Sequence, residues 1–127
     1  MSLGRWIIVA AAAVALSGQP SEQPCREHPK VKAGSCFWFK GRAGIYNGAP
    51  VVRLWRVGTP RILGVSGGMA LPGYASVPKS LTDALAGSLD RYVFGEFEFC
   101  PYVADRPGVM RLGCVNGARR LIVKSVR

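Results

Sequence analysis

The segment from Phe37 to Val65 most constrains the fold, because it contains three short alternating runs separated by two turns. Within the runs, apolar residues alternate with arginines and tryptophans, which is the period of a strand with one buried face. Residues 47–50 and 58–60 have turn composition, since Asn and Gly tolerate positive φ and Pro interrupts strand pairing. The segment therefore predicts half of a small β-barrel, and we expect it also to carry the surface that meets a partner.

The sequence indicates which face is buried for the first of these strands but not for the second. Between residues 36 and 46, one alternating set is uncharged and is expected to face the core. That set is Phe37, Phe39, Gly41, Ala43 and Ile45, whereas the opposite set is Cys36, Trp38, Lys40 and Arg42. Between residues 51 and 57 each face contains an arginine, Arg53 on one and Arg56 on the other, so either face could be buried.

The remainder of the chain predicts one helix and further strands. Leu81, Leu85 and Leu89 recur at helical spacing within 77–90. Alternation predicts a fourth strand at 91–100, a fifth at 109–116, and a sixth or a continuation at 118–123. Asn116-Gly117 between the last two is a hairpin turn signal, and the Gly- and Pro-rich residues 66–76 predict a mobile loop.

The order of these elements predicts a mainly β fold. Three strands, a helix and at least two more strands is the order of an OB-fold, a five-stranded Greek-key barrel with a helix between the third and fourth strands. We therefore expect a small antiparallel barrel of five to six strands, like an OB-fold. An SH3-like barrel and an open antiparallel sheet with one helix are the alternatives.

The N-terminus has the pattern of an export signal. Arg5 precedes an apolar run at 6–16, and small residues follow, which predicts a signal peptide at 1–17 with cleavage after Ser17 or, second, after Ala15. An uncleaved membrane anchor is the alternative. We expect residues 18–34 to form a flexible arm, residues 35–127 to form one domain, and the protein to be periplasmic or secreted.

Export makes two disulfides the expected state of the four cysteines. The sequence leaves three pairings open, and we favour Cys25–Cys36 and Cys100–Cys114 because each joins sequence neighbours across one turn. A zinc site is the alternative, but the chain has no CxxC pair and His28 is its single histidine. We expect no metal and no cofactor.

The chain has a formal charge of +10, because it contains 17 Lys and Arg against 7 Asp and Glu. This charge predicts attraction to polyanions; the alternative is that it serves solubility alone. Aromatic rings stack on sugars, and arginines bind carboxylates or phosphates through two hydrogen bonds. The candidate ligand-binding residues are Lys40, Arg42, Arg53, Trp55 and Arg61. The plainer interpretation is that the tryptophans are packing partners covered by arginine stems.

Two patterns could carry catalysis. Glu96 and Glu98 share one strand face at about 7 Å, within the range used for glycoside hydrolysis, but a cross-strand ion-pair ladder is the plainer interpretation. Residues 64–68 match G-x-S-x-G, but Pro72 opposes the required helix and His28 lies upstream. We expect no enzymatic activity.

A set of motifs between Cys36 and Cys114 resembles small exported bacterial proteins of unknown function. The motifs are Gly41-Arg42, Tyr46-Asn47-Gly48, Pro50, Arg53, Trp55, Gly58-Thr59, Arg61, Leu63-Gly64-Val65, Phe94-Gly95-Glu96-Phe97 and Cys100-Pro101. The resemblance implies export and a small β-domain, and it implies no functional residue.

Three functional hypotheses follow. The first is a binding module for an anionic envelope polymer, a glycan or an anionic lipid surface; nucleic acid is not expected, because export separates the protein from it. The second is an interaction protein that docks on another envelope protein through a sheet edge or the helix bearing Leu81 and Leu85. The third is a small enzyme that uses Glu96 and Glu98.

Overall fold

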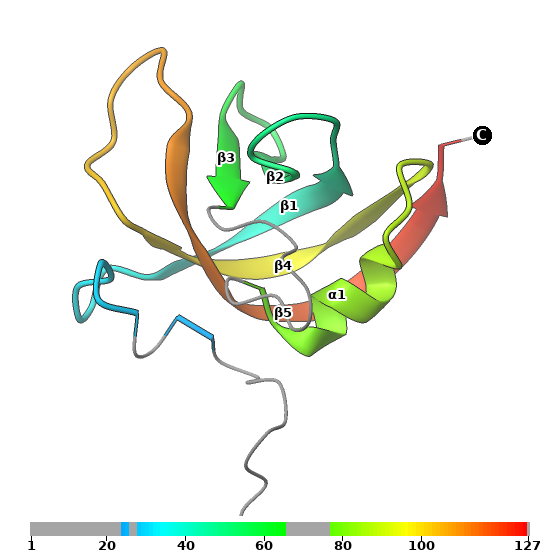
Figure 1. The fold of residues 1–127 in the computed structure, drawn as a ribbon, viewed down its shortest axis with the longest axis horizontal. Helices are drawn as coiled ribbons and strands as arrows, with labels where there is room; N and C mark the ends of the chain where they lie inside the picture. The colour runs from blue at the N-terminus through cyan, green and yellow to red at the C-terminus, as the bar shows by residue number, and fades with distance from the viewer. Residues whose placement is uncertain (1–23, 26–27, 66–76, 127) are drawn as a thin grey trace, which may run out of the picture.

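The computed structural model describes residues 24–25, 28–65 and 77–126. This part of the chain is mainly β, as predicted, with five strands in one sheet and one short helix (Figure 1). The elements are β1 (Phe37–Ile45), β2 (Val52–Arg56), β3 (Ile62–Val65), α1 (Lys79–Leu85), β4 (Arg91–Pro101) and β5 (Arg111–Ser125). The predicted signal peptide at 1–17 and the predicted loop at 66–76 lie outside the described residues.

The strand pairing closes on itself. β1 pairs antiparallel with β2 and with β4, β2 pairs antiparallel with β3, and β4 pairs antiparallel with β5. β3 and β5 pair in parallel, whereas the sequence predicted an antiparallel barrel. The order β1-β2-β3-β5-β4 therefore returns to β1.

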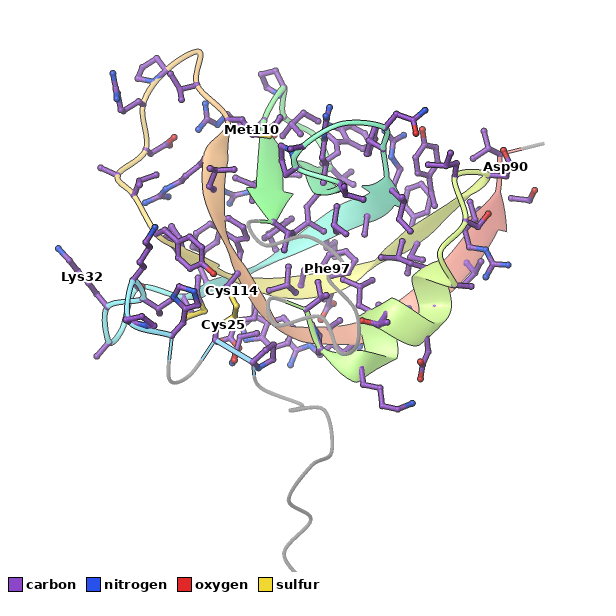
Figure 2. The ribbon with its side chains drawn as sticks, viewed as in Figure 1. Cys25, Lys32, Asp90, Phe97, Met110 and Cys114 are labelled. Atoms are coloured by element: carbon purple, nitrogen blue, oxygen red, sulfur yellow. A yellow bond between two sulfur atoms is a disulfide. The ribbon has the colours of Figure 1, made fainter. Side chains whose placement is uncertain are left out.

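Alternation along the strands separates a core face from an outer face. Phe39 and Ala43 of β1 are buried, as are Val93, Phe97 and Phe99 of β4. Figure 2 shows Phe97 in the interior that the strands enclose. For β2 the structure decides the question that the sequence left open: Val52 and Leu54 are fully buried, Arg53 and Trp55 lie on the outer face, and Arg56 reaches solvent at the end of the strand.

The helix is shorter than the sequence pattern predicted. Leu81 and Leu85 are fully buried, whereas Leu89 is 53% exposed and lies beyond the helix. The helix ends at Leu85 because Ala86 and Gly87 both have positive φ, 51° and 65°. Helix α1 lies beside β5 (Figure 1) and contacts β5, β4 and β1. Its two buried leucines belong to the same hydrophobic core as the strands.

Strand β5 is continuous through Asn116-Gly117, so the turn signal at this point was misleading. The Asn116 side chain is buried, where its Oδ1 accepts a hydrogen bond from the Cys25 backbone and its Nδ2 donates one to Glu98. Gly117 lies under the Trp38 ring, and a Cβ at this position would be 2.9 Å from it. Both residues therefore serve long-range contacts and not a local turn.

The predicted disulfides are wrong in their pairing. The bridges are Cys25–Cys114, labelled in Figure 2, and Cys36–Cys100, with no free cysteine among the described residues. The register of β1 with β4 places Phe37 opposite Phe99 and so brings Cys36 within 4.1 Å of Cys100, measured between Cα atoms. Cys100 and Cys114 are opposite each other on β4 and β5, but each is bonded elsewhere.

These bridges span 89 and 64 residues instead of one turn each. In the chain-entropy picture, loops of this length correspond to about 4 to 5 kcal/mol of stabilisation per bridge. Two disulfides are consistent with a secreted or extracytoplasmic protein. Among the described residues no helix has both the length and the apolar character needed to cross a bilayer.

Candidate functional site

The outer face of β1, β2 and β4 carries a cluster of two arginines and three aromatic residues, which we name the Arg42 stack. Its members are Arg42, Tyr46, Arg53, Trp55 and Tyr92. The strand register assembles it, because Arg42 lies opposite Trp55, and Gly44 lies opposite both Arg53 and Tyr92. Residues opposite each other on paired strands have side chains on the same face, so alternation places the cluster on one surface.

The Arg42 guanidinium lies between two aromatic rings. Its Cζ is 4.9 Å from the centroid of Trp55 on β2 and 4.1 Å from that of Tyr92 on β4. Its Nε is buried and has no hydrogen-bond partner. Because the rings cover the guanidinium and Nε is enclosed, the terminal N–H groups are the part of Arg42 that a ligand can reach.

The second arginine is held in a similar way. Arg53 Cζ is 4.8 Å from the Tyr46 ring centroid, and Arg53 Nε donates a 3.0 Å hydrogen bond to the Pro50 carbonyl oxygen. Trp55 is fixed as well, because its Nε1 donates a 2.7 Å hydrogen bond to the Thr59 carbonyl oxygen. The β1–β2 and β2–β3 turns therefore fix the orientation of the side chains on the strands.

Gly44 makes room for the two tyrosines. A Cβ built at Gly44 would be 2.9 Å from the Tyr92 ring and 3.3 Å from the Tyr46 ring. Contacts as short as the first do not occur in folded proteins, so a side chain at this position would displace Tyr92. The glycine lets both rings lie directly on β1.

Neither arginine of this stack pairs with a carboxylate in the described part of the chain. The ion pairs there are Arg61–Asp105, Lys79–Asp83, Arg119–Glu96 and Arg120–Glu96. The charges of Arg42 and Arg53 are therefore uncompensated, while their planes are held by aromatic contacts. A guanidinium of this kind can take a carboxylate, sulfate or phosphate in its plane through two hydrogen bonds.

The structure brings three of the five predicted ligand-binding residues together, namely Arg42, Arg53 and Trp55. Lys40 lies on the same face two residues before Arg42, is exposed, and is opposite Glu96. Arg61 is not part of the site, because it pairs with Asp105 in the β4–β5 connection.

Tyr46 and Tyr92 are the members of the stack that sequence reasoning missed. Tyr92 was recognisable in principle, because it shares the outer face of its strand with Phe94 and Glu96. Tyr46 follows the last residue of β1, where alternation gives no reliable face.

A second arginine–aromatic cluster, the Trp38 stack, lies on the same outer face. Its members are Trp38, Glu96, Gly117, Arg119 and Arg120. The Trp38 ring covers Gly117, and Arg119 Cζ is 4.0 Å from its centroid. Here a carboxylate is present: Arg119 Nε donates to Glu96 Oε1 at 2.7 Å, and Arg120 Nη1 donates to Glu96 Oε2 at 3.1 Å.

These contacts bear on the proposed use of Glu96 and Glu98. The hydrogen bond from Arg119 is the largest effect on the Glu96 carboxyl and lowers its pKa. Burial acts in the opposite direction, and the charges of Arg120, Arg119 and Lys40 lower the pKa further, so the net direction is downward. Glu98 accepts its hydrogen bond from Asn116 instead. A glycosidase acid needs a raised pKa, so the environment of Glu96 opposes that role.

Metal and nucleophile sites find no support in the described residues. Within these ranges no three or more His, Cys, Asp or Glu side chains converge, and the four cysteines form disulfides. His28 stacks on Tyr102 at 4.4 Å between ring centroids. Ser66 of the G-x-S-x-G match lies outside the described residues.

The chain matches no protein-family model, no curated protein and no solved structure at a significant level. The resemblance to small exported bacterial proteins therefore stays a prediction.

Proposed function

We propose that this protein is an exported, non-catalytic module that binds an anionic polymer or acidic glycan through the Arg42 stack. One observation carries the proposal: Arg42 and Arg53 are held by aromatic rings, with no compensating carboxylate in the described part of the chain. Buried or half-buried cations normally have an anionic partner, so an external anion is the expected complement.

The mechanism is electrostatic recognition by preorganised donors. Each charged hydrogen bond to an anion contributes about 1.5 to 3 kcal/mol, and stacking reduces the side-chain freedom that binding would otherwise cost. The net positive charge, +10 for the full chain and one less once Arg5 is removed with the signal peptide, attracts the polymer over longer distances. Binding of this kind weakens as salt rises.

We further propose that the domain is an OB-fold-like barrel. The closed strand order, the parallel β3–β5 pair and a helix that follows β3 in the chain support this assignment. OB-folds bind oligonucleotides and oligosaccharides at the strand 2–3 face and at the loops after strands 1 and 4. Tyr46 and Arg53 flank the β1–β2 connection, which agrees with such a location for the ligand.

Export by a cleaved signal peptide at 1–17, to the periplasm or the medium, belongs to the same proposal. The apolar run after Arg5 and the two disulfides support it.

The other two hypotheses have less support. Docking through Leu81 and Leu85 requires exposed side chains, but both are fully buried. The sheet also offers little free edge on which a partner could dock, because every strand pairs with two neighbours over at least part of its length. An enzyme using Glu96 would need that carboxyl free of Arg119 and Arg120.

The test is elution from immobilised heparin in a salt gradient. Arg42→Gln/Arg53→Gln should elute at clearly lower salt than wild type. The charge-matched control is Arg56→Gln/Arg106→Gln, which removes two exposed arginines outside the stack. Equal shifts for the two double variants would mean that binding follows net charge alone, and the proposal would be wrong.

A further inference from the structure

A hollow with a volume of about 290 Å³ lies on the outer face of the sheet beside the Arg42 stack. Its floor is the backbone of Gly41 and Gly95, which are opposite each other on β1 and β4. A Cβ on either glycine would meet Phe39 or Leu121 at 2.6 or 2.7 Å, so neither position admits a side chain without rearrangement. Both contacts are on the core side of the sheet, so close packing beneath the floor requires glycine at these two positions.

One wall of the hollow is apolar and open to solvent. It consists of Phe94 on β4, Ile122 opposite it on β5, and Val57 just after β2. Ile122 is 58% exposed and Val57 is 45% exposed. Large apolar side chains gathered around a concave surface favour an apolar ligand group.

The other wall is ionic and carries a net positive charge. Lys40 and Arg120 line it together with Glu96, which already accepts hydrogen bonds from Arg119 and Arg120. The Arg120 side chain is 79% exposed, and Lys40 forms no ion pair within the described residues. The rim can therefore receive an anion next to the apolar wall.

We propose that the hollow binds an anionic amphiphile, with its alkyl chain against Phe94, Ile122 and Val57 and its phosphate or carboxylate headgroup held by Lys40 and Arg120. The rim charge is complementary to such a headgroup. An alkyl chain has no polar groups to satisfy, which suits a wall made of apolar side chains.

Two other occupants fit less well. A peptide brings backbone N–H and C=O groups. β1 and β4 each lie between two paired strands, with Gly95 at an irregularity in the β4–β5 pairing, so neither has an open edge at which a peptide could extend the sheet. A sugar ring brings hydroxyls, and Glu96, the acceptor side chain at the hollow, is already engaged by two arginines. This proposal does not depend on polymer binding by the Arg42 stack.

The test is an NMR titration of the disulfide-bonded protein with monomeric decyl phosphate, below its micelle concentration. Backbone signals of Gly41 and Gly95 should shift. Ile122→Ser and Lys40→Gln should each weaken binding by about tenfold, which matches the loss of one apolar contact or one charged contact. The matched controls Val123→Ser and Lys124→Gln are exposed residues of β5 outside the hollow, and they should stay close to wild type.

Three further probes decide between occupants. Decyl maltoside, which has the chain without the charge, and inorganic phosphate, which has the charge without the chain, should both bind much more weakly. The proposal would be overturned if either probe bound as tightly as decyl phosphate, or if the four variants weakened binding equally. It would also be overturned if decyl phosphate caused no shift of the two glycine signals. Tighter binding of a blocked Glu-Leu-Glu peptide at the same signals would assign the hollow to a protein partner instead.

The Arg42→Gln/Arg53→Gln variant separates this site from the proposed function. It should lose heparin retention and keep decyl phosphate binding. Loss of both would mean that the two regions form one site, which contradicts the assignment of a separate amphiphile site.

Discussion

The Arg42 stack and the Trp38 stack use the same parts on the same face of the sheet, but they differ in charge balance. In each, a glycine lies under an aromatic ring and an arginine lies over it, with Gly44 and Tyr92 in one and Gly117 and Trp38 in the other. Only the Trp38 stack contains a carboxylate among the described residues, that of Glu96. Arg119 and Arg120 share this one carboxylate, so part of the positive charge of the Trp38 stack is balanced within the protein.

The comparison shows that arginine–aromatic contacts alone do not identify a binding site. Stacking fixes where a guanidinium lies, whereas the nearest carboxylate decides how much of its charge is available to a ligand. Matched variants in the two stacks therefore separate stability from binding. A structural role predicts the same loss of stability in both stacks, whereas ligand binding predicts a loss of affinity in the Arg42 stack alone.

The largest effects are expected from the glycines. Gly44→Ala and Gly117→Ala each force an aromatic ring to move, because the new Cβ would lie 2.9 Å from Tyr92 or Trp38. Each should lower the free energy of unfolding by about 1 to 3 kcal/mol, measured by urea denaturation. Gly44→Ala alone should also reduce heparin retention. If Gly117→Ala reduces it equally, the two stacks contribute alike and the contrast between them fails.

A smaller effect is expected from Arg42→Lys and Arg119→Lys. Lysine keeps the charge but lacks the planar group that stacks and binds through two hydrogen bonds. Each change should destabilise the protein by about 0.5 to 1 kcal/mol through the weaker aromatic contact. Arg42→Lys should lower affinity for heparin several-fold in a titration, and Arg119→Lys should leave it unchanged. Unchanged affinity for both would show that the geometry of Arg42 is irrelevant to binding.

The smallest effect concerns pH. The pKa of Glu96 is lower in the folded protein than its ordinary value of 4.5, mainly because of the hydrogen bond from Arg119. The stabilisation from this group is therefore complete above pH 4.5 and is lost as pH falls through the lowered pKa. Melting temperatures between pH 6 and pH 3 should fall slightly less steeply for Glu96→Gln than for wild type. Parallel curves would mean that the ion pairs of the Trp38 stack contribute no pH dependence.

The sequence predicted what local alternation controls. The core face of β1 follows from a spacing of two residues and is confirmed. The outer position of Arg53 and Trp55 could not be decided, because both faces of β2 contain an arginine and burial depends on its neighbours in the sheet.

The sequence did not predict what long-range pairing controls. The disulfides depend on the β1–β4 register, and the ion pair of Arg61 depends on Asp105, which is 44 residues away. Asn116-Gly117 has the composition of a turn, but contacts with Cys25, Glu98 and Trp38 hold it within β5. Local composition was overruled in each case by residues remote in the chain.

The disulfide pattern also determines what a protease can separate. Cys25 and Cys36 precede β1, and their partners, Cys114 and Cys100, lie in the last two strands. One cut anywhere between Cys36 and Cys100 therefore yields two fragments that two covalent bonds still join. Such a nicked chain runs as a single band on a non-reducing gel and as two bands after reduction.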